Sequence, residues 1–210
     1  MAIRGPIVGH TLATLQTTML GFGVSLAVSL PLAVAITASP AIANAVYPLL
    51  VVTQSVPKVA LAPILVVVFG AGETSRVLVT FLVAFFPLVI SIATGLLAVP
   101  PELVELGRSL KATRLQELFR IRLPYAVPFV FSGLKLSITF SVIGAVVGEF
   151  VAAERGLGYQ ILAATAFFRT PIAFGAVIIL SAMGIILFQA VVLIERICFP
   201  WSAQEETSRR

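Results

Sequence analysis

Five long stretches of the sequence are almost continuously apolar, and this feature limits the fold more than any other. A membrane-spanning helix needs roughly 20 mainly apolar residues, and each stretch is long enough. Of the 210 residues, 59% are hydrophobic and 11% are charged, whereas a typical soluble domain has about 25% charged residues. This composition excludes an ordinary soluble domain, a disordered chain and a disulfide-rich secreted domain. The predicted spans are 12–36, 45–69, 75–99, 129–151 and 171–194.

The sequence is poor in residues that bind metals or catalyse reactions. It contains one cysteine, Cys198, one histidine, His10, and no aspartate. We therefore expect no intrachain disulfide and no multi-ligand metal site, and a membrane enzyme would need more acid–base groups. We expect no catalytic residue, and we expect His10 and Cys198 to be incidental. The net charge of +5 comes from basic residues between and after the spans, which predicts membrane topology and not nucleic-acid binding.

Prolines interrupt the second predicted span. Val56-Pro57-Lys58 lies near its middle and Pro63 follows, so we expect this span to be kinked or discontinuous. Lys58 is a cation inside a membrane span, where a charge is unfavourable and usually faces a cavity or a partner. Two interpretations stay open. Lys58 either contacts an anion in a translocation path, or it is a structural lysine that reaches the interface or is neutralised by Glu149 or a backbone carbonyl.

One long polar segment, residues 102–122, carries eight of the charged residues. Its apolar residues recur at helical spacing, which predicts an amphipathic helix. Of the 14 Lys and Arg residues, nine lie on the side of this polar segment, Lys135 among them, if spans four and five form a hairpin. The positive-inside rule then places the polar segment and the C-terminus in the cytoplasm. Five spans put the N-terminus outside, so the chain is either a minimal five-span protein or lacks an upstream helix.

The polar segment resembles the EAA loop of ABC-importer permeases. In that family the loop reads E-A-A, three residues, G, nine residues, and then I-x-L-P. Glu105 takes the first position, and Ile121, Leu123 and Pro124 end the motif at the family's spacing.

Three positions depart from the family pattern. Leu106 and Gly107 stand in place of the two alanines, and Lys111 stands in place of the glycine that normally allows a turn between two short helices. The flanking sequence is nevertheless similar to permeases of the nitrate/sulfonate/bicarbonate (NitT/TauT) branch. The similar segments are 56–63, 85–87, 148–150, 156–159 and 193–196, together with Trp201.

The resemblance implies an all-α fold, that of a type I ABC importer permease. About five transmembrane helices would form a polytopic bundle with a cytoplasmic EAA coupling helix. A single transmembrane permease domain would cover residues 1–210, with the coupling loop at about 101–124 and a cytoplasmic tail at about 196–210. The location it implies is the bacterial inner membrane.

The resemblance also implies that the polar segment couples the permease to an ATPase. Its leucines would anchor in a groove of the partner, and its charges would set the register at the rim. On physical grounds alone, the segment could instead be a solvated loop that only fixes topology. The implied coupling residues are Glu105, Leu106, Arg108, Leu110, Lys111, Arg114, Leu115, Leu118, Ile121, Leu123 and Pro124.

No G-x-x-x-x-G-K-[ST] motif occurs in the sequence, so we expect no cofactor in this chain. ATP and Mg²⁺ would be bound by a partner ATPase. The resemblance implies a second permease copy, generally identical in this branch, two ATPase subunits and an external solute-binding protein. The expected cargo is a small solute such as nitrate, a sulfonate, bicarbonate, an aromatic acid or a vitamin precursor.

Besides Lys58, three residues of span four are candidates for the translocation path. Ser137 and Ser141 could line a polar pore, although small hydroxyls more often serve helix packing. Glu149 lies roughly 27 Å along the span from its cytoplasmic end. We expect it to pair with Arg155 or Arg169, and the alternative is that it gates the pore.

The segment Gly156-Leu157-Gly158 predicts a tight turn, with docking of a binding protein as the alternative. A secondary transporter or channel is the rival function. It would need ion-coupling acids within the bundle, and Glu149 is the one candidate. A structural membrane scaffold would have no use for the EAA-like motif.

Overall fold

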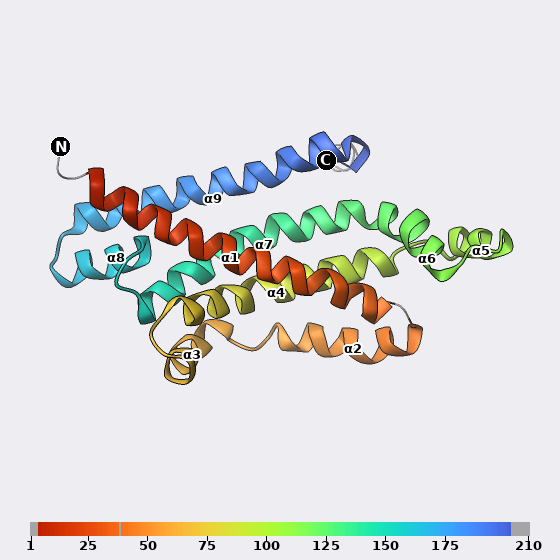
Figure 1. The fold of residues 1–210 in the computed structure, drawn as a ribbon, viewed down its shortest axis with the longest axis horizontal. Helices are drawn as coiled ribbons and strands as arrows, with labels where there is room; N and C mark the ends of the chain where they lie inside the picture. Colours follow the sequence, from red (N-terminus) through yellow and green to blue (C-terminus); the bar gives the residue numbers. More distant parts are fainter. Residues whose placement is uncertain (1–3, 38, 203–210) are drawn as a thin grey trace.

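The structure, a computed structural model, describes residues 4–37 and 39–202, and all regular structure in those ranges is helical. The long helices lie side by side along one axis, with the polar segment at one end of the bundle and the start of the chain at the other (Figure 1). The helices are α1 Arg4–Thr37, α2 Pro40–Thr53, η1 Lys58–Leu61, α3 Ala62–Phe69, α4 Glu73–Leu97, α5 Pro101–Ser109, α6 Arg114–Glu117, η2 Leu118–Arg122, α7 Leu123–Ala152, α8 Leu157–Ala166 and α9 Thr170–Cys198.

The described helices supply the five predicted spans. Four of them are long and apolar enough to cross a membrane: α1, α4, α9 and the run from α6 through α7. The fifth span requires α2 together with η1 and α3, which are bent by 78° across a short break. The expected discontinuity of span two is therefore confirmed.

Prolines explain why α2 and α7 begin earlier than predicted. α2 begins at Pro40, where we expected a turn, because a proline in the first turn lacks only an N–H that the helix does not use. α7 begins at Leu123 and not at Phe129, with Pro124 in its first turn. Ahead of it, η2 is a π turn in which the Leu123 N–H bonds to the Leu118 carbonyl, so the polar segment leads into α7 without a break.

Helix α4 forms the centre of the bundle and packs against both α1 and α7. Leu88, Ile92 and Leu96 of α4 have no exposed surface, and Ile36 of α1 and Ala126 of α7 join the same apolar core. Because α4 is enclosed in this way, any element attached to it is attached to the interior of the bundle.

Small residues bring α4 and α7 into close contact. A Cβ atom added to Gly144 of α7 would collide with the backbone of Thr80 of α4, as is common in membrane helix pairs. The Ser137 hydroxyl donates to the Ala84 carbonyl at 3.1 Å, and the Ser141 hydroxyl donates to the Ser137 carbonyl at 2.8 Å. Both serines are fully buried. Their position corrects the hypothesis that they line a path, because they serve helix packing inside the protomer.

A buried ion pair joins α7 to α9. Lys135 Nζ lies 2.9 Å from Glu195 Oε2, and Ser202 donates to the other carboxylate oxygen of Glu195 at 2.9 Å. The orientation argument counted Lys135, just inside the start of span four, with the charges on the side of the polar segment. The structure places it between α7 and α9, where it forms this internal ion pair.

Candidate functional site

The polar segment is two short helices joined by a sharp turn, which corrects the predicted single amphipathic helix. α5 ends at Ser109, and Lys111 then adopts φ of 58°, in the left-handed region. The Lys111 N–H donates to the Arg108 carbonyl at 2.9 Å, and the Ala112 N–H donates to the Gly107 carbonyl at 3.0 Å. These two bonds form a Schellman turn, whose left-handed position is usually glycine. Lys111 therefore keeps the turn of the EAA pattern at the cost of backbone strain.

A reciprocal cap starts the second short helix. Thr113 Oγ1 accepts the Gln116 N–H at 3.3 Å, and Gln116 Oε1 accepts the Thr113 N–H at 2.8 Å. A Thr followed by Gln three residues later is a recognised sequence signal for a helix start. This signal could have predicted that the segment divides here.

Two apolar residues hold the polar segment to the bundle, and a third packs within the segment. Leu118 and Leu123 pack against the core formed by α1, α4 and α7. Ile121 lies against Gly107, where an added Cβ atom would collide with its side chain. Leu118 is half-buried against the bundle, and its role as an anchor for a partner stays a prediction.

Four other large apolar residues of the polar segment are strongly exposed, and we call them the outer row. The outer row consists of Leu106, Leu110, Leu115 and Phe119, with exposed fractions of 58%, 75%, 67% and 62%. Exposed apolar residues gathered in one short segment are typical of a surface that docks a partner. Phe119 was not among the predicted residues, although it follows Leu115 by four positions, a helical spacing that could have identified it. The predicted coupling residues Glu105, Lys111, Arg114 and Pro124 are also exposed.

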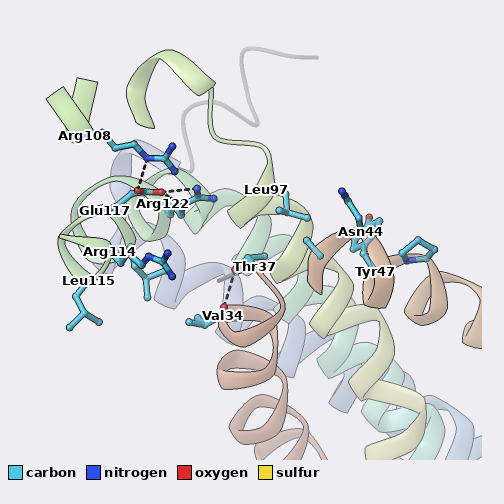
Figure 2. Close-up of a pocket in the computed structure, with 13 residues that line it drawn as sticks. Val34, Thr37, Asn44, Tyr47, Leu97, Arg108, Arg114, Leu115, Glu117 and Arg122 are labelled. Carbon is cyan, nitrogen blue, oxygen red and sulfur yellow. Dashed lines mark hydrogen bonds and ion pairs between the residues drawn. The ribbon is translucent and has the colours of Figure 1, made fainter. Parts of the chain in front are cut away.

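Glu117 forms the centre of an ionic cluster at the base of the polar segment (Figure 2). Its carboxylate lies 2.7 Å from Arg122 Nη2 and 3.6 Å from Arg108 Nε. Arg122 Nη1 also donates to the Leu96 carbonyl at the end of α4, at 3.2 Å. The side chains of Glu117 and Arg122 are only 12% and 21% exposed. This shielding makes their pair stronger than an ion pair in open water.

A cavity of about 630 Å³ lies between the polar segment and the ends of α1, α2 and α4. Figure 2 shows Arg108, Arg114 and Arg122 on the side of the polar segment and Tyr47 and Asn44 on the side of α2. The cavity thus separates a charged wall from the ends of membrane-spanning helices.

The side chain of Lys58 connects the two sides of the break in the second span. Its ammonium donates to the Gln54 carbonyl at 3.1 Å and lies 4.7 Å from the centre of the Phe86 ring of α4. Of the structural alternatives, neutralisation by a backbone carbonyl is the one observed, and Glu149 is not its partner in the described residues. Residues 54–57 beside it are exposed.

At the opposite end of the bundle, three side chains from other helices cap the start of α8. Its first amides have no partner within the helix. The three bonds are Gly156 N–H to His10 Nδ1 at 3.0 Å, Leu157 N–H to Thr14 Oγ1 at 2.8 Å and Gly158 N–H to Glu149 Oε2 at 2.7 Å. Gly156 has φ of 132°, which confirms the predicted tight turn.

This cap corrects two expectations. His10 is not incidental, because it holds the turn before α8. Glu149 is buried and bonds to α8, and neither Arg155 nor Arg169 forms an ion pair with it among the described residues. Glu149 therefore has a structural partner other than those predicted.

Comparisons with known proteins agree on one family. A family model described as "Binding-protein-dependent transport system inner membrane component" matches residues 20–197. The chain is 36% identical to the formylaminopyrimidine transport permease protein ThiX of Halalkalibacterium halodurans, over 93% of this chain and 78% of that protein. It is 37% identical to the riboflavin transport system permease protein RibX of Chloroflexus aurantiacus, over 92% and 72% of the two chains.

A more distant relative and a solved structure extend the comparison. The taurine transport system permease protein TauC of Escherichia coli is 28% identical, over 93% of this chain and 71% of that protein. An inward-facing structure of the MetNI methionine ABC transporter superposes with a TM-score of 0.77 at 20% identity, over 88% of this chain and 92% of that chain. The structural likeness shows a shared fold.

Proposed function

Because the chain belongs to the family of inner membrane components of binding-protein-dependent transport systems, we propose that it carries a solute along a path opened by separate ATPase subunits. The chain is the permease subunit of an ABC importer and a multi-pass membrane protein. In this proposal the ATPase subunits bind ATP and Mg²⁺, and the polar segment receives their motion.

The broken second span carries the proposal of a path. Residues 54–57 are non-helical and exposed. Lipid cannot satisfy the polar groups of irregular backbone, so such a break must face protein or water at membrane depth. Lys58 beside the break contacts Phe86, which lies near the middle of α4, so the break is deep in the membrane. A solvated path shared with a second copy of the chain accounts for this exposed face.

The proposed cargo is a small solute delivered by an external binding protein. The names of the relatives specify formylaminopyrimidine, riboflavin and taurine. We include anions such as nitrate, sulfonates and bicarbonate, and small organic compounds such as aromatic acids and vitamin precursors. A cation deep in the membrane at Lys58 favours an anion in this range.

The proposed assembly contains two copies of this permease and two ATPase subunits, with the polar segment and the end of α9 in the cytoplasm. Both lie at the same end of the bundle (Figure 1). The orientation can be checked with cysteines introduced one at a time at the exposed Ser109 and Glu154, at opposite ends, after Cys198 is replaced by serine. A membrane-impermeant maleimide should label Glu154→Cys in intact cells and Ser109→Cys only after permeabilisation.

Coupling through the outer row is tested by co-purification. We would purify the chain from its native host in a mild detergent and identify bound subunits by mass spectrometry. We expect a P-loop ATPase in the same molar amount as the permease. Leu110→Asp, at the most exposed position of the outer row, should abolish that association. Ile197→Asp is the matched control, because Ile197 is 70% exposed at the same end of the bundle but lies in α9. Normal recovery of the ATPase with Leu110→Asp would refute the coupling role.

A further inference from the structure

The cavity beside the polar segment has a strongly basic wall. Arg108, Arg114 and Arg122 line it, and Glu117 is the one acid among its lining residues. Glu117 is already engaged with Arg122 at 2.7 Å and Arg108 at 3.6 Å. Among the described residues Arg114 forms no ion pair, so the wall keeps an excess of positive charge facing the cavity.

The opposite wall belongs to the membrane-spanning helices and is mainly apolar. Its apolar part is formed by Val34 of α1, Ala43 and Pro48 of α2, and Leu97 of α4, and Thr37, Asn44 and Tyr47 add polar groups. Val34, Ala43 and Leu97 lie near the ends of their helices, where the bundle meets the membrane surface. A ligand in this cavity therefore meets arginines on one side and a mainly apolar surface with a few polar groups on the other.

We propose that this cavity binds a phosphate group, and that an anionic phospholipid is the ligand that matches both walls. The planar guanidinium groups of Arg108 and Arg114 can each donate two parallel hydrogen bonds to phosphate oxygens. Basic pockets between membrane helices at the cytoplasmic surface suit anionic headgroups. A soluble phosphate shares the headgroup chemistry but leaves the apolar wall uncovered. The lipid assignment rests on the cytoplasmic orientation proposed above, which the maleimide labelling tests separately.

A bound phosphate would bridge two parts of the permease. Arg108 and Arg114 belong to the polar segment, whereas the facing residues belong to α1, α2 and α4. A ligand held by both would fix the polar segment relative to the bundle. The membrane's content of anionic lipid would thereby affect how firmly the two parts move together.

The test measures thermal unfolding of the detergent-purified chain, together with any subunits that remain bound. Dioleoyl phosphatidylglycerol, dioleoyl phosphatidylcholine and inorganic phosphate are titrated in separate arms. We expect phosphatidylglycerol to raise the unfolding temperature and phosphatidylcholine to have little effect. Arg114→Gln removes an exposed side chain without an ion pair, and it should weaken the apparent affinity for phosphatidylglycerol by about tenfold.

Arg120→Gln is the matched control, because Arg120 is exposed in the same segment but does not line the cavity. It should leave the phosphatidylglycerol titration unchanged. Protection by inorganic phosphate alone, lost in Arg114→Gln, would support the phosphate site with a soluble source. Equal protection by both lipids, or an equal loss in Arg120→Gln and Arg114→Gln, would overturn the proposal.

Discussion

Arg122 joins two parts of the protein, because its guanidinium lies 2.7 Å from Glu117 and also donates to the Leu96 carbonyl at 3.2 Å. Glu117 ends α6, whereas Leu96 lies in the last turn of the enclosed helix α4. One side chain thus connects the polar segment with the most buried helix of the bundle. If an ATPase moves the polar segment, this connection is a direct route for the motion into the membrane.

Replacing Arg122 should therefore impair the transfer of motion more than the docking of the ATPase. Arg122→Met removes both bonds and leaves Glu117 with a 3.6 Å contact to Arg108. We expect about 1–3 kcal/mol of lost stability and fewer solute molecules carried per ATP hydrolysed in proteoliposomes. Arg120→Met, at an exposed neighbour, should change neither quantity. An unchanged ratio of transport to hydrolysis in Arg122→Met would limit Arg122 to a local stabilising role.

The left-handed conformation of Lys111 predicts a stabilising substitution. Lys111→Gly should remove most of the strain at φ of 58°, since the left-handed conformation costs a non-glycine residue roughly 1–2 kcal/mol. Part of this gain is offset by the greater freedom of glycine in the unfolded chain, so we expect a net gain of about 0.5–1 kcal/mol. Thermal unfolding in detergent measures it. Lys111→Ala, which removes the charge and keeps the strain, should give no such gain.

The sequence was most informative where structure depends on local composition and spacing. Apolar length identified the five spans, and Pro57 identified the break in the second. It was less informative about the polar segment, because the helical spacing of the leucines predicted one helix. The two signals of a turn, Lys111 at the motif's glycine position and the cap formed by Thr113 and Gln116, were not used to divide it. The cap of α8 could not be predicted from local patterns, because His10 and Gly156 are 146 positions apart in the chain.

Gly156 should tolerate no side chain. It has φ of 132°, and a Cβ atom there would collide with the carboxylate of Glu149. Gly156→Ala should displace the cap and destabilise the protein by at least about 2 kcal/mol, from strain and from buried polar groups left unpaired. Limited proteolysis between α7 and α8 and thermal unfolding would both report this. Gly175→Ala is the control, because a Cβ atom at Gly175 meets no atom within 4 Å. Equal stability of the two variants would refute this account of the cap.

Replacing only one member of the Lys135–Glu195 ion pair should destabilise the protein strongly. Lys135→Met leaves the Glu195 carboxylate, whose side chain is 4% exposed, without its ammonium partner. Removing one member of a buried pair typically costs about 3–5 kcal/mol. Glu195→Gln added to Lys135→Met should recover much of that loss, because no charge is then left alone. Thermal unfolding of the wild type, both single variants and the double variant gives the coupling energy, and simple additivity would contradict a specific pair.

Lys58 gives the most direct test of the proposed path, because it has a structural contact and a proposed functional one. Its bond to the Gln54 carbonyl and its contact with Phe86 predict that Lys58→Met loosens the break. If the ammonium also meets the cargo, Lys58→Met should slow the uptake of an anionic solute by about tenfold or more, with assembly unchanged. Lys58→Arg keeps the charge and should retain most of the uptake.

The two roles of Lys58 are separated by stability and cargo charge. A purely structural lysine predicts that Lys58→Met lowers the unfolding temperature and slows neutral and anionic cargo equally, whereas a path lysine predicts a selective loss for the anion. Uptake by reconstituted complexes, measured with a bound ATPase and the matching binding protein, distinguishes the two. An equal loss of uptake for both cargoes would mean that Lys58 only stabilises the broken span. The exposed residues 54–57 would then be the next positions to test for contact with the cargo.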